Sequence, residues 1–194
     1  MKQSFLFLAN GFEEVEALTA VDVLRRAGIP VKTVSITESL QVTGAHGISV
    51  KADVLYDNTL FDSPEWIILP GGMPGSVNLY DFAPLQGLIE RQANGSDGRI
   101  AAICAAPAVV LGQLGVLKGV KATCYPGFED RLNGAIYEDK PVVVDGKFVT
   151  GSGPARALDW ALTIVRETVG SHQANEVAAG MLAYPAECTP VDFG

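Results

Sequence analysis

Residues 4–36 read SFLFLANGFEEVEALTAVDVLRRAGIPVKTVSI, and this stretch predicts a strand, a helix and a second strand in succession. The run at 4–9 is continuously apolar, which is typical of a buried strand. After the turn at Asn10-Gly11, apolar residues recur at helical spacing over 13–27, and Gly28 and Pro30 end that helix before the strand at 31–36. A β-α-β unit of this kind favours a parallel sheet covered on both faces.

The same alternation continues along the chain. The pattern predicts strands at 66–69, 99–104 and 120–124, and hairpins over 40–55 and 141–150. It predicts helices over 76–93 (divided near Pro84), 106–114, 155–169 and 172–182. We therefore expect a doubly wound, mostly parallel α/β sheet, in which ligands bind beyond the carboxyl ends of the strands.

The composition fits a single globular domain. The chain has 194 residues, of which 48% are hydrophobic and 19% charged, and its mean hydropathy is +0.24. We place one domain at 1–185 and an irregular tail at 186–194. The net charge of −8 and the pI near 4.7 argue against a nucleic-acid partner. The three cysteines have no CxxC spacing and no apolar run could span a membrane, so we expect a soluble, cytoplasmic protein with no membrane partner.

Three loops, 10–16, 70–75 and 104–107, follow predicted strands and are expected to face one pocket. Cys104 ends a strand, and small residues follow it at the start of a helix. Such a turn resembles the elbow that exposes a nucleophile, and the helix start favours a thiolate. The competing interpretation is an inert buried cysteine, and the position alone does not choose between the two.

Other residues of these loops are candidates for the same pocket. The first helical turn contains Glu13, Glu14 and Glu16, whose negative charges interact favourably with the helix dipole. If one of these side chains instead turned into a pocket, it could exchange protons with a substrate. The pattern does not show which of the three would do so. The N–H groups of the Gly71-Gly72 turn, with that of Ala105, would form an oxyanion hole, although the glycines also suit a plain tight turn. No Walker A or GxGxxG motif, and no histidine spacing typical of a metal site, is present in the sequence.

Four segments resemble the ThiJ/PfpI superfamily, and in particular the branch of the Parkinson's-linked protein deglycase and its bacterial relatives. They are Asn10–Ala17 (NGFEEVEA), Ile68–Gly72 (ILPGG), Ala101–Pro107 (AAICAAP) and Thr150–Pro154 (TGSGP). The resemblance runs from about residue 4 to residue 183, with the motifs in the family's order.

The resemblance implies a flavodoxin-like three-layer sandwich, similar to the class I glutamine amidotransferases, and a homodimer. It implies a nucleophilic Cys104 with a strained backbone, a protonated Glu16 that bonds the sulfur, and oxyanion contacts from the Gly72 and Ala105 backbones. We expect substrate contacts from Gly71, Tyr125, Glu13 and His46, and no metal or cofactor.

The sequence departs from that branch at two positions. Tyr125 stands where a histidine near the cysteine is common, and His46 where some members have an arginine. Without the histidine a peptidase triad is incomplete, so we expect instead an enzyme of glyoxalase or deglycase type, acting on reactive dicarbonyls or their early protein adducts. The alternative is an oxidative-stress regulator or chaperone that senses peroxide through a Cys104 sulfinate. Nothing in the residues supports a phosphate or glutamine site of thiamine-pathway or amidotransferase chemistry.

Overall fold

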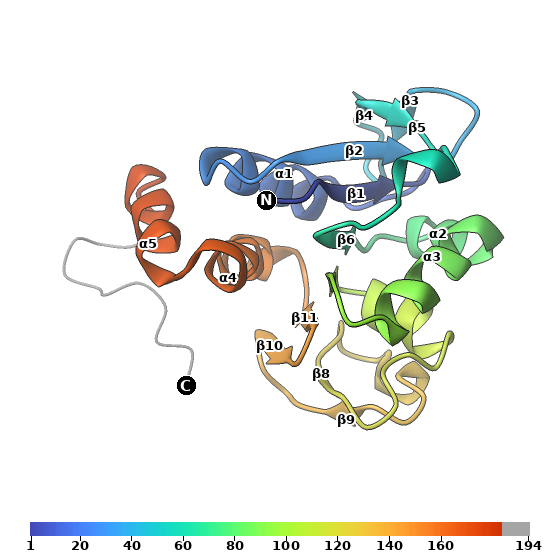
Figure 1. The fold of residues 1–194 in the computed structure, drawn as a ribbon. Coiled ribbons are helices and arrows are strands. Elements are labelled where there is room, and N and C mark those ends of the chain that lie inside the picture. The colour runs from blue at the N-terminus through green and yellow to red at the C-terminus, as the bar shows by residue number, and fades with distance from the viewer. Residues whose placement is uncertain (184–194) are drawn as a thin grey trace.

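The computed structural model describes residues 1–183, which form a central seven-stranded sheet with helices on both faces (Figure 1). The strand order is β10-β11-β7-β6-β1-β2-β5, and every pairing in this sheet is parallel except β10 with β11. Its strands are β1 (Ser4–Leu8), β2 (Val31–Ser35), β5 (Val54–Leu55), β6 (Trp66–Leu69), β7 (Arg99–Ile103), β10 (Val142–Asp145) and β11 (Phe148–Gly151). Two small sheets pair β3 (Gln41–Thr43) with β4 (Ser49–Lys51), and β8 (Lys121–Ala122) with β9 (Ile136–Tyr137).

The helices form one layer on each face of the sheet. They are α1 (Glu14–Arg26), α2 (Gly75–Asp81), α3 (Ala83–Asn94), α4 (Ala157–Val169) and α5 (Ser171–Gly180), together with a π-helix at Pro107–Gly112 and short 3₁₀ turns at Asn58–Leu60, Glu129–Arg131 and Pro154–Arg156. One apolar core lies between the sheet and the layer of α1, α4 and α5, and a second lies between the sheet and the layer of α2, α3 and the π-helix. This arrangement confirms the expected mostly parallel, three-layer α/β fold.

The first β-α-β unit shows why the sequence folds this way. All five residues of β1 are buried, because the strand pairs with β2 on one side and β6 on the other and is covered on both faces. The Glu13 side chain caps α1 by accepting a hydrogen bond from the Glu16 N–H, and Arg25 and Arg26 stabilise the negative end of the helix dipole. This unit therefore places the start of α1 at the carboxyl edge of the central strands.

Several sequence expectations need correction. The predicted α-helix at 106–114 is a π-helix over Pro107–Gly112. Six residues are too few for an apolar pattern to separate these two periods. The strand predicted at 120–124 ends at Ala122, because the Thr123 N–H bonds the side-chain hydroxyl of Thr150 in β11 instead of a backbone carbonyl. The short strands β5 and β9 were not predicted.

The predicted hairpins and the division of the helix at 76–93 are confirmed. The first hairpin, β3–β4, stands outside the main sheet, whereas the second, β10–β11, joins it through the parallel pairing of β11 with β7. Pro84 lies at the start of α3, just after the break at Phe82. The predicted tail at 186–194 lies outside the described residues, and so does Cys188.

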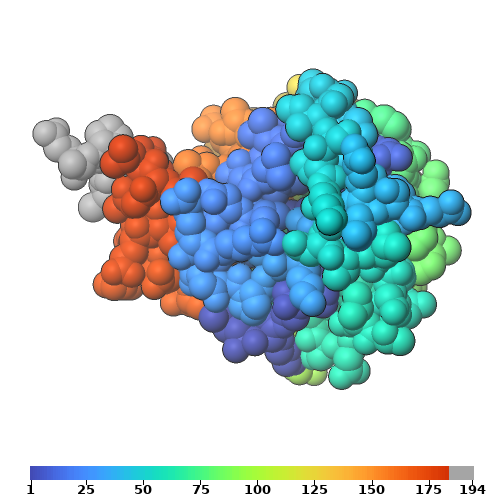
Figure 2. Space-filling model, turned by 90° about the horizontal axis from the view of Figure 1, so that it is seen from above, coloured from blue at the N-terminus to red at the C-terminus, as the bar shows by residue number. Residues whose placement is uncertain are grey.

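The space-filling view shows α5, in red, at one end of the molecule beside the blue N-terminal segment (Figure 2). This agrees with the packing of α5 on α4 and of α4 on α1. Within residues 1–183, none of the helices has the length and apolar character needed to cross a membrane.

Candidate functional site

Cys104 lies immediately after β7, where the chain turns from the sheet toward the π-helix. Its φ angle is +62°, in the left-handed region that residues other than glycine rarely adopt. The Cys104 N–H bonds the Gly151 carbonyl over 2.9 Å, and its carbonyl accepts from the Tyr125 N–H over 2.8 Å. Two neighbouring segments therefore hold this backbone in a conformation that costs free energy, as at many functional turns.

Glu16 enters the same place from the first turn of α1. Its side chain is fully buried, and its Oε2 atom accepts a hydrogen bond from the Gly71 N–H over 2.7 Å. The other oxygen, Oε1, is buried and has no nitrogen or oxygen donor among the described residues. The Cys104 thiol interacts with the Glu16 carboxyl, and this interaction affects the pKa values of both groups.

The two acidic groups form a coupled pair with little contact with water. Burial raises the pKa of the Glu16 carboxyl to about 8 against the lowering effect of the Gly71 N–H, and the charge of Glu13 raises it further. Burial, followed by the charge of Glu16, also raises the pKa of the Cys104 thiol, although the N–H groups of Gly72 and Ala105 lower it. Glu16 is therefore mostly protonated at neutral pH.

The direction of the thiol shift corrects one sequence expectation. We expected the helix start to favour a thiolate, and the two backbone N–H groups do act in that direction. Desolvation of a buried anion outweighs them, because only 8% of Cys104 is exposed. The cysteine therefore needs a neighbouring base to give up its proton.

Glycines allow the three loops to approach one another. A Cβ atom at Gly71 would lie 2.6 Å from the Cys104 Cβ and 2.7 Å from Glu16 Oε2. Gly72 has a φ of +90°, and a Cβ there would lie 2.5 Å from the Glu13 nitrogen. These contacts are shorter than side chains tolerate. The backbone after β6 therefore comes close to the Cys104 and Glu16 side chains only because Gly71 and Gly72 carry no side chain.

Tyr125 reaches the site from the segment after β8. A Cβ at Gly153 would lie 3.2 Å from Tyr125 Cδ2, so the ring packs closely against that glycine. The Phe128 ring meets it edge-on, with ring centroids 6.4 Å apart and an interplanar angle of 77°. Tyr125 remains 45% exposed. An aromatic side chain with one open side is thus fixed beside the end of β7.

His46 and Glu14 form a separate contact that the sequence did not reveal. The buried Glu14 carboxylate accepts hydrogen bonds from the His46 N–H over 2.7 Å and from the Ile48 N–H over 3.4 Å, and it contacts His46 Nδ1 over 2.8 Å. Burial acts to raise the pKa of Glu14, but the His46 hydrogen bonds outweigh it and lower the pKa. This carboxylate therefore anchors the turn of the β3–β4 hairpin to the start of α1.

Glu13, Glu14 and His46 together place three potential metal ligands within 4.8 Å of one another. Glu13 Oε2 already caps α1, and both Glu14 oxygens are engaged by the hairpin. These hydrogen bonds account for the cluster as part of the fold.

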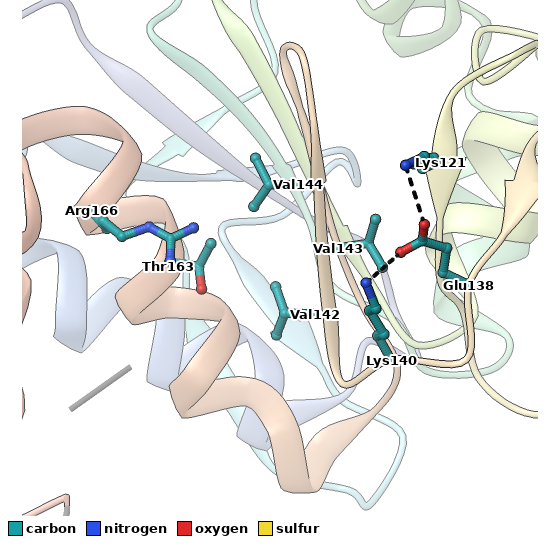
Figure 3. Close-up of a pocket in the computed structure, with 8 residues that line it drawn as sticks. All are labelled: Lys121, Glu138, Lys140, Val142, Val143, Val144, Thr163 and Arg166. Carbon is teal, nitrogen blue, oxygen red and sulfur yellow. Dashed lines mark ion pairs between the residues drawn. The ribbon is translucent and has the colours of Figure 1, made fainter. Parts of the chain in front are cut away.

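A hollow of about 230 Å³ lies at the edge strand β10, and it contains none of the residues expected at the site (Figure 3). It is lined by Lys121, Glu138, Lys140, Val142, Val143, Val144, Thr163 and Arg166. Glu138 pairs with both lysines, at 3.6 Å and 3.0 Å, while Thr163 and Arg166 project from α4 on the other side of the strand. With no cysteine in its lining, this hollow offers no chemistry like that of Cys104.

The structure thus brings Cys104, Glu16, Gly71, Gly72 and Ala105 together, with Tyr125 alongside, and ties His46 to Glu14. Sequence reasoning missed two supporting residues, Glu14 and Gly153. Glu14 was interpreted as a helix-dipole residue or a proton carrier but not as an anchor of the hairpin, and Gly153 was interpreted as part of the turn that opens α4. The signal for Gly153 was its place in the TGSGP segment, since its backbone is extended and does not itself require glycine.

Comparison with known proteins identifies relatives of this chain. Residues 2–167 match the model of the DJ-1/PfpI family. Protein DJ-1 homolog B of Arabidopsis thaliana is 38% identical over 95% of this chain, which spans only 42% of that protein's length. A protein of Pyrococcus horikoshii named as a deglycase is 36% identical, with 86% of this chain and 98% of the relative covered.

Among solved structures, oxidized DJ-1 of Toxoplasma gondii superposes with a TM-score of 0.89 at 37% identity, covering 95% of this chain and all of the other. The family match covers most of the chain, and the relatives align across nearly all of it. The chain therefore belongs to the DJ-1/PfpI family.

Proposed function

We propose that the protein is a cysteine-dependent enzyme that acts on reactive dicarbonyls, or on their early adducts with proteins, with Cys104 as nucleophile and Glu16 as proton carrier. The observation that carries this proposal is a buried carboxyl with a pKa of about 8 beside a buried thiol. An acid poised near neutral pH both accepts and returns protons during a reaction.

The first step is addition of Cys104 to an aldehyde. As the sulfur attacks the carbonyl carbon, Glu16 in its ionised form takes the thiol proton and then returns it to the carbonyl oxygen, which becomes the hydroxyl of a hemithioacetal. The N–H groups of Gly72 and Ala105, which already interact with the sulfur, stabilise negative charge as it develops nearby.

The second step moves hydrogen between the two carbons of the dicarbonyl. Glu16 removes the proton from the hemithioacetal carbon and delivers a proton to the former ketone carbon, which becomes an alcohol. The first carbon is thereby oxidised to a thioester as the second is reduced, so no outside oxidant is needed. Water then cleaves the thioester, releasing a 2-hydroxy acid and the free thiol.

Conversion of methylglyoxal to lactate tests this proposal. Purified wild-type protein is expected to form lactate, and Cys104→Ser to lose at least about 100-fold in kcat/KM. Cys124→Ser is the matched control, because Cys124 is another buried thiol but lies outside the candidate site. Equal rates for wild type and Cys104→Ser would refute the proposal.

A second experiment separates free dicarbonyls from their adducts. The Pyrococcus relative is named as a deglycase, which favours adducts as substrates. Supplying a preformed hemithioacetal of methylglyoxal with N-acetylcysteine, and trapping any free methylglyoxal that dissociates, distinguishes the two. Release of N-acetylcysteine faster than spontaneous dissociation would indicate deglycation, and an unchanged rate would indicate action on the free dicarbonyl.

We propose as a second candidate function the sensing of peroxide through oxidation of Cys104 to a sulfinic acid. The Toxoplasma relative was solved in an oxidized form, and here Glu16 provides a protonated carboxyl beside the sulfur. Two equivalents of peroxide would supply the two oxygens and leave as water. Mass spectrometry after mild peroxide should show both oxygens on Cys104, and earlier oxidation of Cys124 would refute this function.

We further propose that the protein forms a homodimer. Val15 and Leu18 on α1 and Ile48 in the hairpin are apolar yet exposed, at 53%, 44% and 55%. Such side chains favour burial against a second copy. Light scattering should give twice the monomer mass for wild type, with a shift to monomer in Leu18→Glu, whereas a monomeric wild type would refute the dimer.

A further inference from the structure

The side chain of Tyr125 has an environment that suits a ligand with a flat ring. One side of its ring lies against Gly153, where even a Cβ atom would come within 3.2 Å of it. Phe128 packs edge-on beside it, and the Tyr125 N–H is fixed to the Cys104 carbonyl over 2.8 Å. These three contacts hold the ring, while 45% of the residue stays exposed.

Gly153 supports this interpretation independently. Its φ of 169° is extended backbone that any residue adopts, so the turn itself does not require glycine. The close contact of a hypothetical Cβ is with the Tyr125 ring, and among residues 1–183, apart from those adjoining Gly153 in the chain, no other neighbour lies within 4 Å. The absence of a side chain at this position therefore lets the ring approach the backbone closely.

Backbone hydrogen bonds join the segments that carry Tyr125 and Gly153 to the nucleophile's residue. Gly151, at the end of β11, accepts a hydrogen bond from the Cys104 N–H over 2.9 Å, and Gly153 follows two residues later. Tyr125 is joined to Cys104 through its own backbone. The residue that carries the ring is thus bonded through its backbone to the residue that carries the sulfur, and aromatic rings attract other flat rings through offset or edge-to-face contacts.

We propose that Tyr125, supported by Gly153, is a specificity-determining residue that forms an aryl-binding subsite. The preferred dicarbonyls then carry a planar aromatic substituent, so phenylglyoxal is a better substrate than methylglyoxal. The role of this subsite in catalysis rests on the proposed function. Binding of an aromatic ligand to the subsite, however, is measurable without turnover.

The kinetic test compares the two dicarbonyls. The measured quantity is kcat/KM for phenylglyoxal divided by kcat/KM for methylglyoxal. We expect this ratio to be about three- to ten-fold higher in the wild type than in Tyr125→Ala, and Tyr125→Phe to stay close to the wild type. Gly153→Ala should lower the ratio by displacing the ring, whereas Gly180→Ala, where a Cβ meets no atom, should not. An unchanged ratio in Tyr125→Ala would overturn the inference.

The binding test uses two neutral, unreactive probes, 2-hydroxyacetophenone and hydroxyacetone, titrated by NMR. These differ in carrying a phenyl or a methyl group beside the same hydroxyketone. Wild type and Tyr125→Phe should bind the phenyl probe about three- to ten-fold more tightly, and Tyr125→Ala should lose that preference. Equal affinities in wild type would overturn the inference. A preference without any dicarbonyl turnover would support the subsite and refute the proposed function.

Discussion

The Gly71 N–H donates a hydrogen bond to Glu16 Oε2 over 2.7 Å, and a Cβ atom on Gly71 would lie at the same distance from that oxygen. The contact therefore depends on a glycine. It orients a fully buried carboxyl that also interacts with the Cys104 thiol. The backbone after β6, the start of α1 and the turn after β7 form a single functional unit through this bond.

Gly71→Ala should disrupt this unit. The added methyl group would meet both the Cys104 Cβ and the Glu16 carboxyl, so one of them must move. We expect a loss of at least about 10-fold in kcat/KM for methylglyoxal, and a fall in the free energy of unfolding of about 1–3 kcal/mol from overpacking. Lactate assays and urea unfolding measure both effects. Gly180→Ala is the control, and a fully active Gly71→Ala would contradict the role of this contact.

Glu16 should set the pH dependence of activity. Because its ionised form accepts the thiol proton and its pKa is about 8, kcat/KM should rise with pH toward that value and then level off. Glu16→Gln should lose about 100-fold or more and show no such rise. The measurement is kcat/KM as a function of pH for both proteins. If kcat/KM rose with pH in Glu16→Gln as it does in the wild type, the titration would belong to another group.

Glu16 should also make the wild type less stable as pH rises. Its pKa is raised from 4.5 to about 8 on folding, so the folded chain holds this proton more tightly than the unfolded chain does. The stabilisation is fully present below pH 4.5 and is lost as pH rises to about 8. At pH 9, Glu16→Gln should therefore be more stable than wild type by at least about 1 kcal/mol in urea unfolding. A less stable variant at that pH would show that desolvation of Glu16 is not the dominant effect.

Glu14 should stabilise the β3–β4 hairpin within a limited pH window. Its pKa is lowered, so its contribution is present above pH 4.5 and is lost as pH falls through the folded value. The pKa of His46 is raised by its hydrogen bond with Glu14, so that contribution is complete below pH 6.5 and is lost as pH rises through the raised value. Glu14→Ala should cost about 1–3 kcal/mol of unfolding free energy at pH 6, because two backbone N–H groups lose their acceptor.

Glu176→Ala provides the control for that measurement. Glu176 also faces a histidine, His172, but across 3.8 Å and with both side chains exposed. We expect less than about 0.5 kcal/mol from this change. Equal losses in the two variants would show that the buried hydrogen bonds of Glu14 do not hold the hairpin.

The sequence predicted most of the architecture because the apolar runs of β1, β6 and β7 and the amphipathic α1 and α4 are long enough to show their periods. It did not distinguish the π-helix from an α-helix, and it missed β5 and β9, which have two residues each. Strands that short leave no pattern and depend on their neighbours for pairing.

The candidate site was predictable to a similar degree. Strand ends placed the Cys104 turn near Gly71 and Gly72, but choosing Glu16 from three acids required family resemblance. The structure gives the physical distinction: Glu13 caps α1, Glu14 anchors the hairpin, and Glu16 alone turns to the thiol. Nor did the sequence show that burial would raise the pKa of Cys104, since desolvation depends on packing from both helical layers.

The most direct test of the Cys104–Glu16 pair is to let the wild-type protein convert methylglyoxal in D₂O and to examine the lactate by NMR. If Glu16 carries protons between the two carbons, deuterium from exchange at its carboxyl should appear at C2 of lactate, and Glu16→Gln should form almost no product. Lactate that retains only the original hydrogen at C2, formed at an undiminished rate by Glu16→Gln, would contradict the account.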